Sequence, residues 1–393
     1  MKTEQPVSLA LNEGLKQFER LPTTTKELAI LMDEAEKTVG PERIALQRSL
    51  PASPVVGTAN LIRKSREIRL ASRPAGIPAA ENFTLVEVTL EPLQVQQVLV
   101  RNLFMSVDPY MRGRMNDGKS YVPPFEVGRV LDGGAVGEVI ESRAKEFKVG
   151  DIVTSGCGWR ESFIAAPKEL YPVRREVQPL SVHLGALGMT GLTAWAGLNL
   201  INLKLSDVVF ISGAAGAVGN VAGQLAKLQG CTVIGSAGSP EKVRFLLEEC
   251  GFNGAFNYKD APVLDQLKQA APNGIDVYFD NVGGESLEAA LDWLRPHGRI
   301  VACGSISGYN DEKPRPGPAN LFNMITKRLT MKGLIVSDWL NRRVDFNQEV
   351  GRYYEAGKLK NHETVVKGID HAVAAFLGLF EGKNVGKMIV DLR

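Results

Sequence analysis

A strand-like run that leads straight into three spaced glycines constrains this chain more than any other feature. The residues VVFISGAAGAVGNVAGQLAKLQG (208–230) predict a buried strand over Val208–Ile211, a tight turn and a helix that follows at once. Gly213, Gly216 and Gly219 allow the turn, let backbone N–H groups approach a pyrophosphate and let the helix pack closely on the sheet. We therefore predict a dinucleotide-binding turn. The alternative is a strand–helix turn that holds no ligand.

The second strand of this unit indicates which dinucleotide binds. NAD-binding proteins usually place Asp or Glu at the end of that strand to hold the ribose hydroxyls. Here the strand in CTVIGSAGSPEKVR ends in residues 236–239, which include no carboxylate, and Lys242 and Arg244 open the next helix. Cations at this point favour a 2′-phosphate, so we expect NADP(H) rather than NAD(H). A solvated Lys242 beside Glu241 is the alternative.

Two patterns divide the chain after its first 58 residues. From about 66 to 172, short alternating apolar runs broken by glycine predict an all-β, partly closed barrel. From about 185, strands alternate with helices, which is typical of a parallel doubly wound sheet. The fold class is therefore α/β, with a barrel domain beside that sheet. We assign residues 59–185 and 351–393 to the barrel domain and residues 186–350 to the dinucleotide-binding domain.

Residues 1–58 differ from the rest and form an appendage in this interpretation. Thr24 and Glu27 have capping-box spacing, and apolar residues at helical intervals then predict one helix near 25–39. The segment PASPVVGTA (51–59) is typical of a linker. The appendage packs on the remaining chain, mediates assembly or derives from an upstream start codon.

Composition excludes several other classes of protein. Lys and Arg number 46 against 44 Asp and Glu, so the formal net charge is +2 and a nucleic-acid partner is not favoured. No run of about 18 apolar residues exists, so we expect no membrane span. The cysteines (Cys157, Cys231, Cys250 and Cys303) lie far apart and fit a reducing compartment. With glutamates near the start arguing against a targeting peptide, we expect a cytoplasmic protein.

Strings beyond the glycine turn resemble one family. LASRP, DPYMRGRM, GMTGLTAW, SPEKV, FNYK, YFDNVGG and EGKNVGK are similar to the zinc-independent branch of the medium-chain dehydrogenase/reductase superfamily, above all to NADPH-dependent curcumin and prostaglandin reductases. The resemblance runs from about Ile68 to Leu392. It implies a GroES-like β-barrel catalytic domain, a Rossmann doubly wound parallel sheet and reduction of the double bond of α,β-unsaturated ketones and aldehydes. It also implies a homodimer joined through the edge of the Rossmann sheet.

The resemblance further implies a set of cofactor-binding residues. Lys242 and Tyr258 would bind the adenosine phosphate, and Asn281 and Asn384 would lie along the ribose and the nicotinamide. The other members line the pyrophosphate and the nicotinamide channel: Met189, Thr190, Gly191, Gly213, Gly216, Ala217, Val218 and Gly219. Alternatives remain: Asn281 turns the chain, and Met189 is a core residue.

The sequence argues against a bound metal. His183 lies near the junction of the two domains, and His297, His362 and His371 lie beyond it, so residues 66–172 contain no histidine. Zinc-bearing relatives carry a glycine-histidine-glutamate element where this chain has PFEVGRVLDGGAVGEV. With Cys157 alone in that region, three ligands cannot be assembled, and we expect no metal.

Without a metal, conjugate reduction fits a hydride donor helped by hydrogen bonds. Hydride adds to the β-carbon of an enone, charge collects on the carbonyl oxygen, and the protein must donate to that oxygen. A phenol with a pKa of about 10 suits this role. The candidate catalytic residues are Tyr110, Tyr121 and Tyr309, of which Tyr309 follows the strand that ends near Cys303. The alternative is that they are loop aromatics packed against prolines.

Three further features leave alternatives open. Asp108, Arg112 and Arg114 are expected to form an ion-pair network that shapes a barrel loop, or else to contact the cofactor or a carboxylated substrate. The segment DEKPRPGP (311–318) forms a lid or a solvated connector. The function is an NADPH-dependent enone reductase, an NADPH quinone reductase or a non-catalytic NADPH-binding partner protein.

Overall fold

The computed structural model describes residues 63–313 and 315–393. The predicted helix near 25–39 and the predicted linker 51–59 lie outside these residues. The remaining predicted segments fall within one compact unit. No helix in the described part of the chain is long and apolar enough to cross a membrane.

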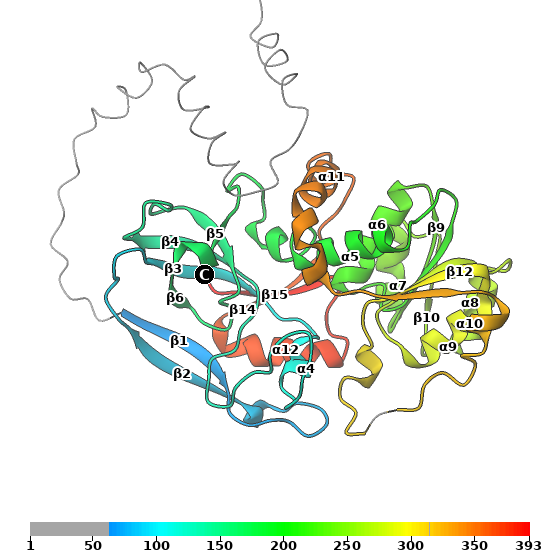
Figure 1. The fold of residues 1–393 in the computed structure, drawn as a ribbon, viewed down its shortest axis with the longest axis horizontal. Coiled ribbons are helices and arrows are strands. Elements are labelled where there is room, and N and C mark those ends of the chain that lie inside the picture. Colours follow the sequence, from blue (N-terminus) through cyan, green and yellow to red (C-terminus); the bar gives the residue numbers. More distant parts are fainter. Residues whose placement is uncertain (1–62, 314) are drawn as a thin grey trace, which may run out of the picture. The chain divides into compact units, whose positions relative to one another are not determined.

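A six-stranded parallel sheet carries the glycine-rich turn (Figure 1). Its spatial order is β10-β9-β8-β11-β12-β13, and every neighbouring pair is parallel. The order reverses direction between β8 and β11, which is the switch point at which open α/β sheets bind ligands. The strands are β8 (Val208–Ile211), β9 (Thr232–Ala237), β10 (Gly254–Asn257), β11 (Ile275–Asp280), β12 (Leu294–Ala302) and β13 (Thr330–Gly333). The predicted doubly wound parallel sheet is confirmed.

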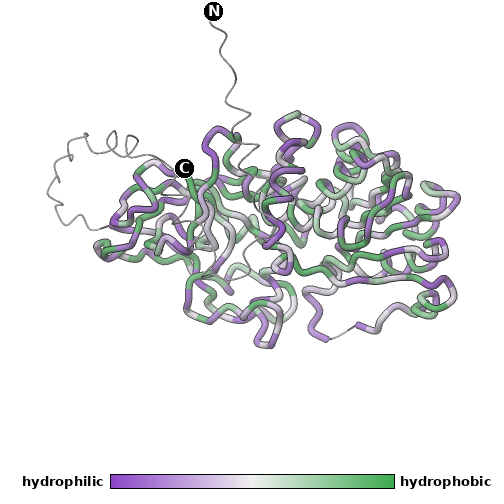
Figure 2. The backbone as a smooth tube through the Cα atoms, turned by 45° about the horizontal axis from the view of Figure 1, so that its top comes forward, coloured by the Kyte–Doolittle hydropathy of each residue, from purple (hydrophilic) through white to green (hydrophobic). Residues whose placement is uncertain are grey.

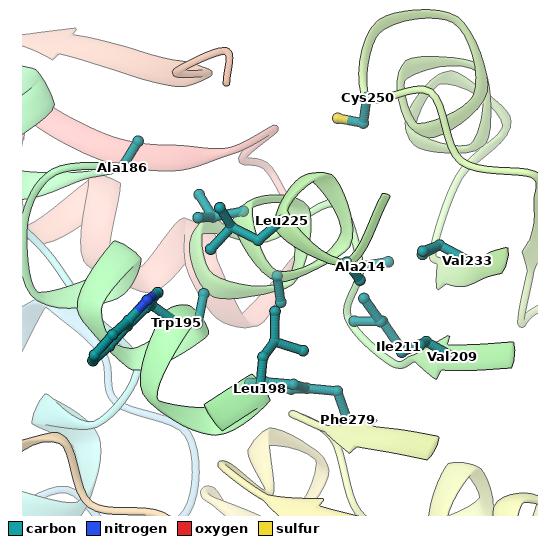
Figure 3. Packing of buried hydrophobic residues seen from close by; sticks show 14 of the residues in the cluster. Ala186, Trp195, Leu198, Val209, Ile211, Ala214, Leu225, Val233, Cys250 and Phe279 are labelled. Carbon is teal, nitrogen blue, oxygen red and sulfur yellow. The ribbon is translucent and has the colours of Figure 1, made fainter. Parts of the chain in front are cut away.

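Both faces of this sheet are buried by helices. Val209 and Ile211 point to the core that holds Trp195 and Leu225 (Figure 3), whereas Phe210 between them joins the core on the other face. Because successive side chains are buried on opposite faces of the sheet, these strands appear in the sequence as continuous apolar runs and not as an alternation of apolar and polar residues. The helices are α5 (Met189–Leu200), α6 (Ala217–Leu228), α7 (Pro240–Arg244), α8 (Val263–Ala270), α9 (Gly284–Trp293), α10 (Asn323–Thr326) and α11 (Arg343–Glu355).

A second, seven-stranded sheet forms the predicted barrel domain. The C-terminal strand β15 pairs antiparallel with β3, so the end of the chain returns to the barrel. Beside this sheet lies the hairpin of β1 (Arg63–Leu70) and β2 (Phe83–Leu90). The larger sheet contains β3 (Val98–Ser106), β4 (Ala135–Ser142), β5 (Ile152–Ser155), β6 (Ser162–Ala165), β7 (Tyr171–Pro172), β14 (Glu363–Lys367) and β15 (Lys387–Asp391).

Two helices cover the barrel, α4 (Met111–Arg114) and α12 (Ala372–Phe380). Phe376 of α12 meets Phe83 and Trp159 edge-on, and this aromatic cluster lies in a core with Met105. Figure 2 shows hydrophobic stretches alternating with hydrophilic ones along the backbone. Single-turn elements complete the chain: η2 (Ala80–Asn82), η3 (Pro167–Glu169), η4 (Leu180–Leu184), η5 (Phe245–Glu249), η6 (Ile306–Gly308), η7 (Val336–Arg342) and η8 (Ile369–His371).

The strands of the two sheets fall on either side of the domain boundaries predicted from the sequence. β1–β7, β14 and β15 lie in 59–185 and 351–393, and β8–β13 lie in 186–350. This division supports those boundaries, which stay a prediction.

Candidate cofactor and substrate site

The turn between β8 and α6 accepts only glycine at two of its positions. Gly213 has a φ of +57°, a conformation that residues with a side chain rarely adopt. A Cβ on Gly219 would lie 2.6 Å from the carbonyl oxygen of Gly213 and 2.8 Å from Cα of Ala214. The turn therefore packs backbone against backbone, as the predicted dinucleotide-binding turn requires.

The N-terminus of α6 offers free N–H groups at the end of this turn. The first helical hydrogen bond runs from the N–H of Asn220 to the oxygen of Gly216, at 3.1 Å. The N–H groups of Ala217, Val218 and Gly219 precede it, and no side chain caps this end of the helix in the described residues. Because such groups point along the helix axis and carry its positive dipole, they suit a pyrophosphate.

The neighbouring ends of β9 and β10 lead to two lysines and an aromatic ring. Lys242 Nζ donates to the carbonyl oxygen of Gly382 at 2.8 Å. Burial lowers the pKa of Lys242, and the charge of nearby Lys259 lowers it further. The ring of Tyr258 lies against Gly238, where a Cβ would stand 3.0 Å from the ring. Two neighbouring ammonium groups without a bridging carboxylate fit the 2′-phosphate of NADP(H).

A buried carboxylate fixes the end of β11 beside the glycine turn. Oδ1 of Asp280 accepts hydrogen bonds from the Tyr278 hydroxyl at 2.7 Å and from the N–H groups of Val282 and Gly283 at 2.9 and 2.7 Å. Burial nevertheless raises the pKa of Asp280 above its usual value. The cluster holds in place the loop that follows β11.

Asn281 joins this loop to β8. Its Nδ2 donates to the carbonyl oxygen of Ser212 at 2.9 Å, and its own N–H donates to the Ser212 hydroxyl at 3.1 Å. A Cβ on Gly213 would lie 3.5 Å from Cβ of Asn281. Asn281 thus lies next to the glycine turn, and its amide orders the two strand ends. Its contact with the cofactor stays a prediction.

The GMTG segment forms the tight start of α5. The Thr190 hydroxyl donates to the oxygen of Gly185 at 3.0 Å and is buried. A Cβ on Gly191 would lie 1.9 Å from the oxygen of Ala186, so a side chain cannot fit there. Of the predicted residues Met189, Thr190 and Gly191, only Met189 has an exposed side chain. It is 37% exposed on the first turn of α5.

The GKNVGK segment lies directly on the glycine turn. The N–H of Gly386 donates to the oxygen of Ala215 at 2.8 Å, and Gly386 forms an isolated bridge with Gly216. Nδ2 of Asn384 donates to the oxygen of Gly386 at 2.8 Å. Asn384 therefore lies in a short loop that is bonded to the glycine turn, where the pyrophosphate is predicted to bind.

The three predicted tyrosines lie together, although they come from both sheets. Arg112, two residues after Tyr110, donates to Oδ1 of Asn310, which directly follows Tyr309, and Tyr121 contributes to the raised pKa of both Tyr110 and Tyr309. Burial is the main cause of the raised pKa of all three hydroxyls. Cys303, at the end of β12, contributes to the raised pKa of Tyr121 and Tyr309. Tyr309 follows β12 at the carboxyl edge of the parallel sheet, and contact of the three tyrosines with a substrate stays a prediction.

The predicted ion-pair network of Asp108 with Arg112 and Arg114 is wrong. Asp108 pairs with Lys387, with 3.0 Å between Oδ1 and Nζ. Arg114 instead pairs with Asp132 at 3.4 Å. The reason is the return of β15 to the barrel, which brings a distant lysine beside Asp108.

Arg112 is buried and binds only neutral oxygens in the described residues. Its guanidinium donates to the oxygen of Gly76 at 2.8 Å, to Oδ1 of Asn116 at 2.6 Å and to Oδ1 of Asn310 at 3.2 Å. It thereby joins the barrel loop to the segment next to Tyr309. The predicted lid at 311–318 begins just after Asn310 and stays a prediction.

Residues 63–313 and 315–393 contain no group of three His, Cys, Asp or Glu side chains placed to hold a metal ion. The predicted absence of zinc stays a prediction based on the sequence.

Known proteins resemble the chain over both sheets. Residues 66–173 match the family described as the N-terminal domain of oxidoreductase, and residues 217–352 match the family described as zinc-binding dehydrogenase. The chain is 41% identical to the NADP⁺-dependent 2-alkenal reductase of Nicotiana tabacum over 83% of its length and 97% of that protein. It is 38% identical to the NADPH-dependent curcumin reductase of Escherichia coli over 84% of its length and 97% of that protein.

The chain belongs to the medium-chain dehydrogenase/reductase family. The solved complex of CurA from Vibrio vulnificus with NADPH is 39% identical, has a TM-score of 0.80 and matches 84% of this chain and 99% of that one. The family and the fold class predicted from the motifs are both confirmed.

Sequence reasoning missed three residues of this medium-chain dehydrogenase/reductase site. Lys259 directly follows the predicted Tyr258, and Asp280 directly precedes the predicted Asn281, so the motifs FNYK and YFDNVGG contain both. A search for charged residues next to motif positions could have found them. Lys387 closes the motif GKNVGK, but nothing local to it indicates a contact with Asp108.

Proposed function

We propose that this chain is an NADPH-dependent reductase of the carbon–carbon double bond of α,β-unsaturated ketones and aldehydes. The observation that carries the proposal is the place of Tyr309 near the loop that joins the glycine turn. A Cβ on Gly304 would lie 3.2 Å from the Tyr309 hydroxyl oxygen and 3.2 Å from the oxygen of Asn281, whose side chain donates to Ser212. Relatives named as 2-alkenal and curcumin reductases, at 41% and 38% identity, support the substrate class.

The cofactor in this proposal is NADP(H). The N–H groups that open α6 take the pyrophosphate, and Lys242, Tyr258 and Lys259 take the 2′-phosphate. The donors present support this choice, because β9 ends without a carboxylate that would repel the phosphate. Asn281, Asn384 and Met189 lie on the side of the ribose and the nicotinamide.

When bound, NADPH supplies the hydride that adds to the β-carbon of the enone. The tyrosine hydroxyls donate hydrogen bonds to the carbonyl oxygen, where negative charge develops. Burial keeps these phenols protonated, because it raises their pKa above the usual value. Each can therefore donate at neutral pH, and the α-carbon is protonated in a later step.

We also propose a homodimer joined through β13. This strand forms one edge of the parallel sheet, and the large apolar side chains Leu321, Phe322 and Ile325 nearby in sequence are 52, 69 and 70% exposed. An unpaired edge beside exposed apolar side chains suits pairing with a second copy. We also propose a cytoplasmic location. The four cysteines are free, which fits a reducing compartment.

The test is NADPH oxidation with a panel of a 2-alkenal, a linear enone and a quinone, each repeated with NADH. Rapid turnover of a linear substrate with NADPH supports the proposal. Turnover of the quinone alone would favour the quinone reductase, and silence across the panel would favour a binding protein.

A further inference from the structure

A buried ion pair joins the barrel loop to the last strand of the chain. Asp108 and Lys387 have side chains that are 5% and 3% exposed, and Nζ lies 3.0 Å from Oδ1. Nζ also donates to the carbonyl oxygens of Val107 at 2.9 Å and Met388 at 3.0 Å. The second carboxylate oxygen accepts from the Ser106 hydroxyl. Every donor of the ammonium is used, so the pair has one well-defined geometry.

The Asp108 end of this pair is joined to Tyr110 through the main chain. The N–H of Met111 donates to the main-chain oxygen of Asp108 at 3.1 Å, which closes a four-residue turn with Pro109 and Tyr110 at its centre. Proline fixes φ at the second position of this turn. Met111 is fully buried, so both ends of the turn are anchored and Tyr110 is held between them.

The ammonium end of the pair is tied to the cofactor turn. Lys387 directly follows Gly386, whose N–H donates to the oxygen of Ala215 at 2.8 Å. The N–H of Lys387 itself donates to the oxygen of His362 at 2.8 Å. A Cβ on Gly386 would lie 2.1 Å from that same oxygen, so the chain has no freedom at this point.

We propose that Asp108 and Lys387 are positioning residues that set the Tyr110 hydroxyl relative to the glycine-rich cofactor turn. Neither side chain reaches the substrate in this account. The proposal rests on the proposed function, because Tyr110 is taken there as a donor to the carbonyl oxygen. It adds the series of contacts, or positioning path, that aligns this donor. The glycine turn is bonded to Gly386, Lys387 follows Gly386 and pairs with Asp108, and Asp108 closes the turn that holds Tyr110.

A double-mutant cycle between Asp108 and Tyr110 tests the proposal. Asp108→Asn keeps the shape and an acceptor oxygen but removes the charge, and we expect kcat with a 2-alkenal to fall about 10- to 100-fold. In the Tyr110→Phe background the same substitution should change kcat by less than about twofold, because the hydroxyl to be aligned is gone. All four proteins are compared at saturating NADPH, so that a change in cofactor affinity does not enter kcat. Equal losses in both backgrounds would overturn the proposal.

The chain offers a matched control in a second buried ion pair. Asp207 and Arg299 lie 2.7 Å apart with side chains 8% and 15% exposed, and Asp207 precedes β8 at the end of that strand away from the glycine turn. Asp207→Asn should lower the temperature of unfolding and leave kcat unchanged. If Asp108→Asn does not fold, Lys387→Arg serves in its place, since it keeps the charge and alters the geometry.

Hydrogen exchange gives a readout that does not depend on turnover. In Asp108→Asn, the amides of 108–115 and of 213–219 should both exchange faster than in the wild type, and in Asp207→Asn neither segment should. Unchanged exchange in both segments would overturn the positioning path. If wild-type protein binds NADPH but reduces no enone, the proposed function fails, and the exchange result alone then decides whether the path exists.

Discussion

The hydroxyl oxygen of Tyr309 accepts a hydrogen bond from the N–H of Ser305 at 3.3 Å. Because the oxygen is an acceptor in this contact, the phenolic proton is left to point elsewhere. Tyr121 and Cys303 lie near the same hydroxyl, and burial raises the pKa of the Cys303 thiol to about 12. A phenol and a thiol that are both neutral at physiological pH therefore lie near each other, and only the phenol is a strong donor.

Replacing Tyr309 by phenylalanine should slow the reaction without weakening cofactor binding. Removing one donor to a developing oxyanion costs about 100- to 1000-fold in kcat in well-studied enzymes. We expect a loss of about 10- to 1000-fold for Tyr309→Phe and for Tyr110→Phe, measured as NADPH oxidation under saturating substrate. Tyr171→Phe, at an exposed site on β7, serves as the control. Wild-type kcat in both variants would contradict the donor role.

Lys242 in α7 and Lys259 just after β10 should determine the preference for NADPH. Lys242→Ala and Lys259→Ala each remove a charged contact to the 2′-phosphate, so the Kd for NADPH should rise about 10- to 100-fold. The Kd for NADH, which lacks that phosphate, should stay nearly constant. Titration of protein fluorescence measures both values. The matched control is Lys204→Ala, which changes an exposed lysine before β8. An equal rise of the Kd for NADPH and for NADH in the Lys242 and Lys259 variants would refute the assignment.

A methyl group at Gly219 should damage both stability and cofactor binding. The added Cβ would lie 2.6 Å from the oxygen of Gly213, so the turn must shift. We expect Gly219→Ala to cost about 1–3 kcal/mol of unfolding free energy and to weaken NADPH binding. Gly351→Ala, inside α11 with no atom within 4 Å of the new Cβ, should gain about 1 kcal/mol. Denaturant unfolding compares the two, and equal stability would exclude the steric argument.

Acid should destabilise the fold through two partly buried histidines. Burial lowers the pKa of His183 and His362, and the Nε2 atom of each is buried without a hydrogen-bond partner in the described residues. A lowered folded-state pKa gives stability that is present above the unfolded value of about 6.5 and is lost as pH falls through the folded value. The unfolding temperature should therefore fall between about pH 8 and pH 5.5.

The His183→Gln/His362→Gln double variant tests the source of this pH dependence. Its unfolding temperature should fall less over the same pH range, because glutamine does not titrate. His371→Gln, at an exposed site, should behave like the wild type. A pH dependence that survives in the double variant would assign the effect to other groups.

The dimer proposal predicts a monomer when charge enters the exposed patch. Phe322→Asp places a carboxylate beside β13, and sedimentation should then report a single chain where the wild type reports two. Val95→Asp changes an 81% exposed apolar residue in the barrel half and should leave the dimer intact. A wild-type protein that sediments as a single chain would end the proposal.

Local sequence patterns predicted the parts of the structure that local forces build. The strand Val208–Ile211 and the helix that follows it were predicted at the residues where they occur, because a buried strand, spaced glycines and a helix lie side by side in the chain. Tyr258, Asn281 and Asn384 came only from the family resemblance. Lys259 and Asp280, which stand beside two of these residues, were missed because the resemblance named only the motif positions themselves.

Contacts between distant segments could not be predicted in this way. Asp108 was matched with the nearest arginines, whereas it pairs with Lys387 because β15 returns beside β3. Hydrophobic periodicity indicates which face of a strand is buried but not which strand lies next to it. Topology predicted only the place of Tyr309, which follows β12 at the carboxyl edge. The hydrogen bond from Arg112 to Asn310, which brings the barrel loop of Tyr110 to this segment, could not be predicted.

The most direct test of the central claim is the product formed from a 2-alkenal and NADPH by the purified full chain, identified by nuclear magnetic resonance while NADPH oxidation is followed. The account predicts a saturated aldehyde, with one NADPH consumed for each double bond and little product with NADH. An allylic alcohol, which would mean that the carbonyl was reduced, or the absence of any product would contradict it.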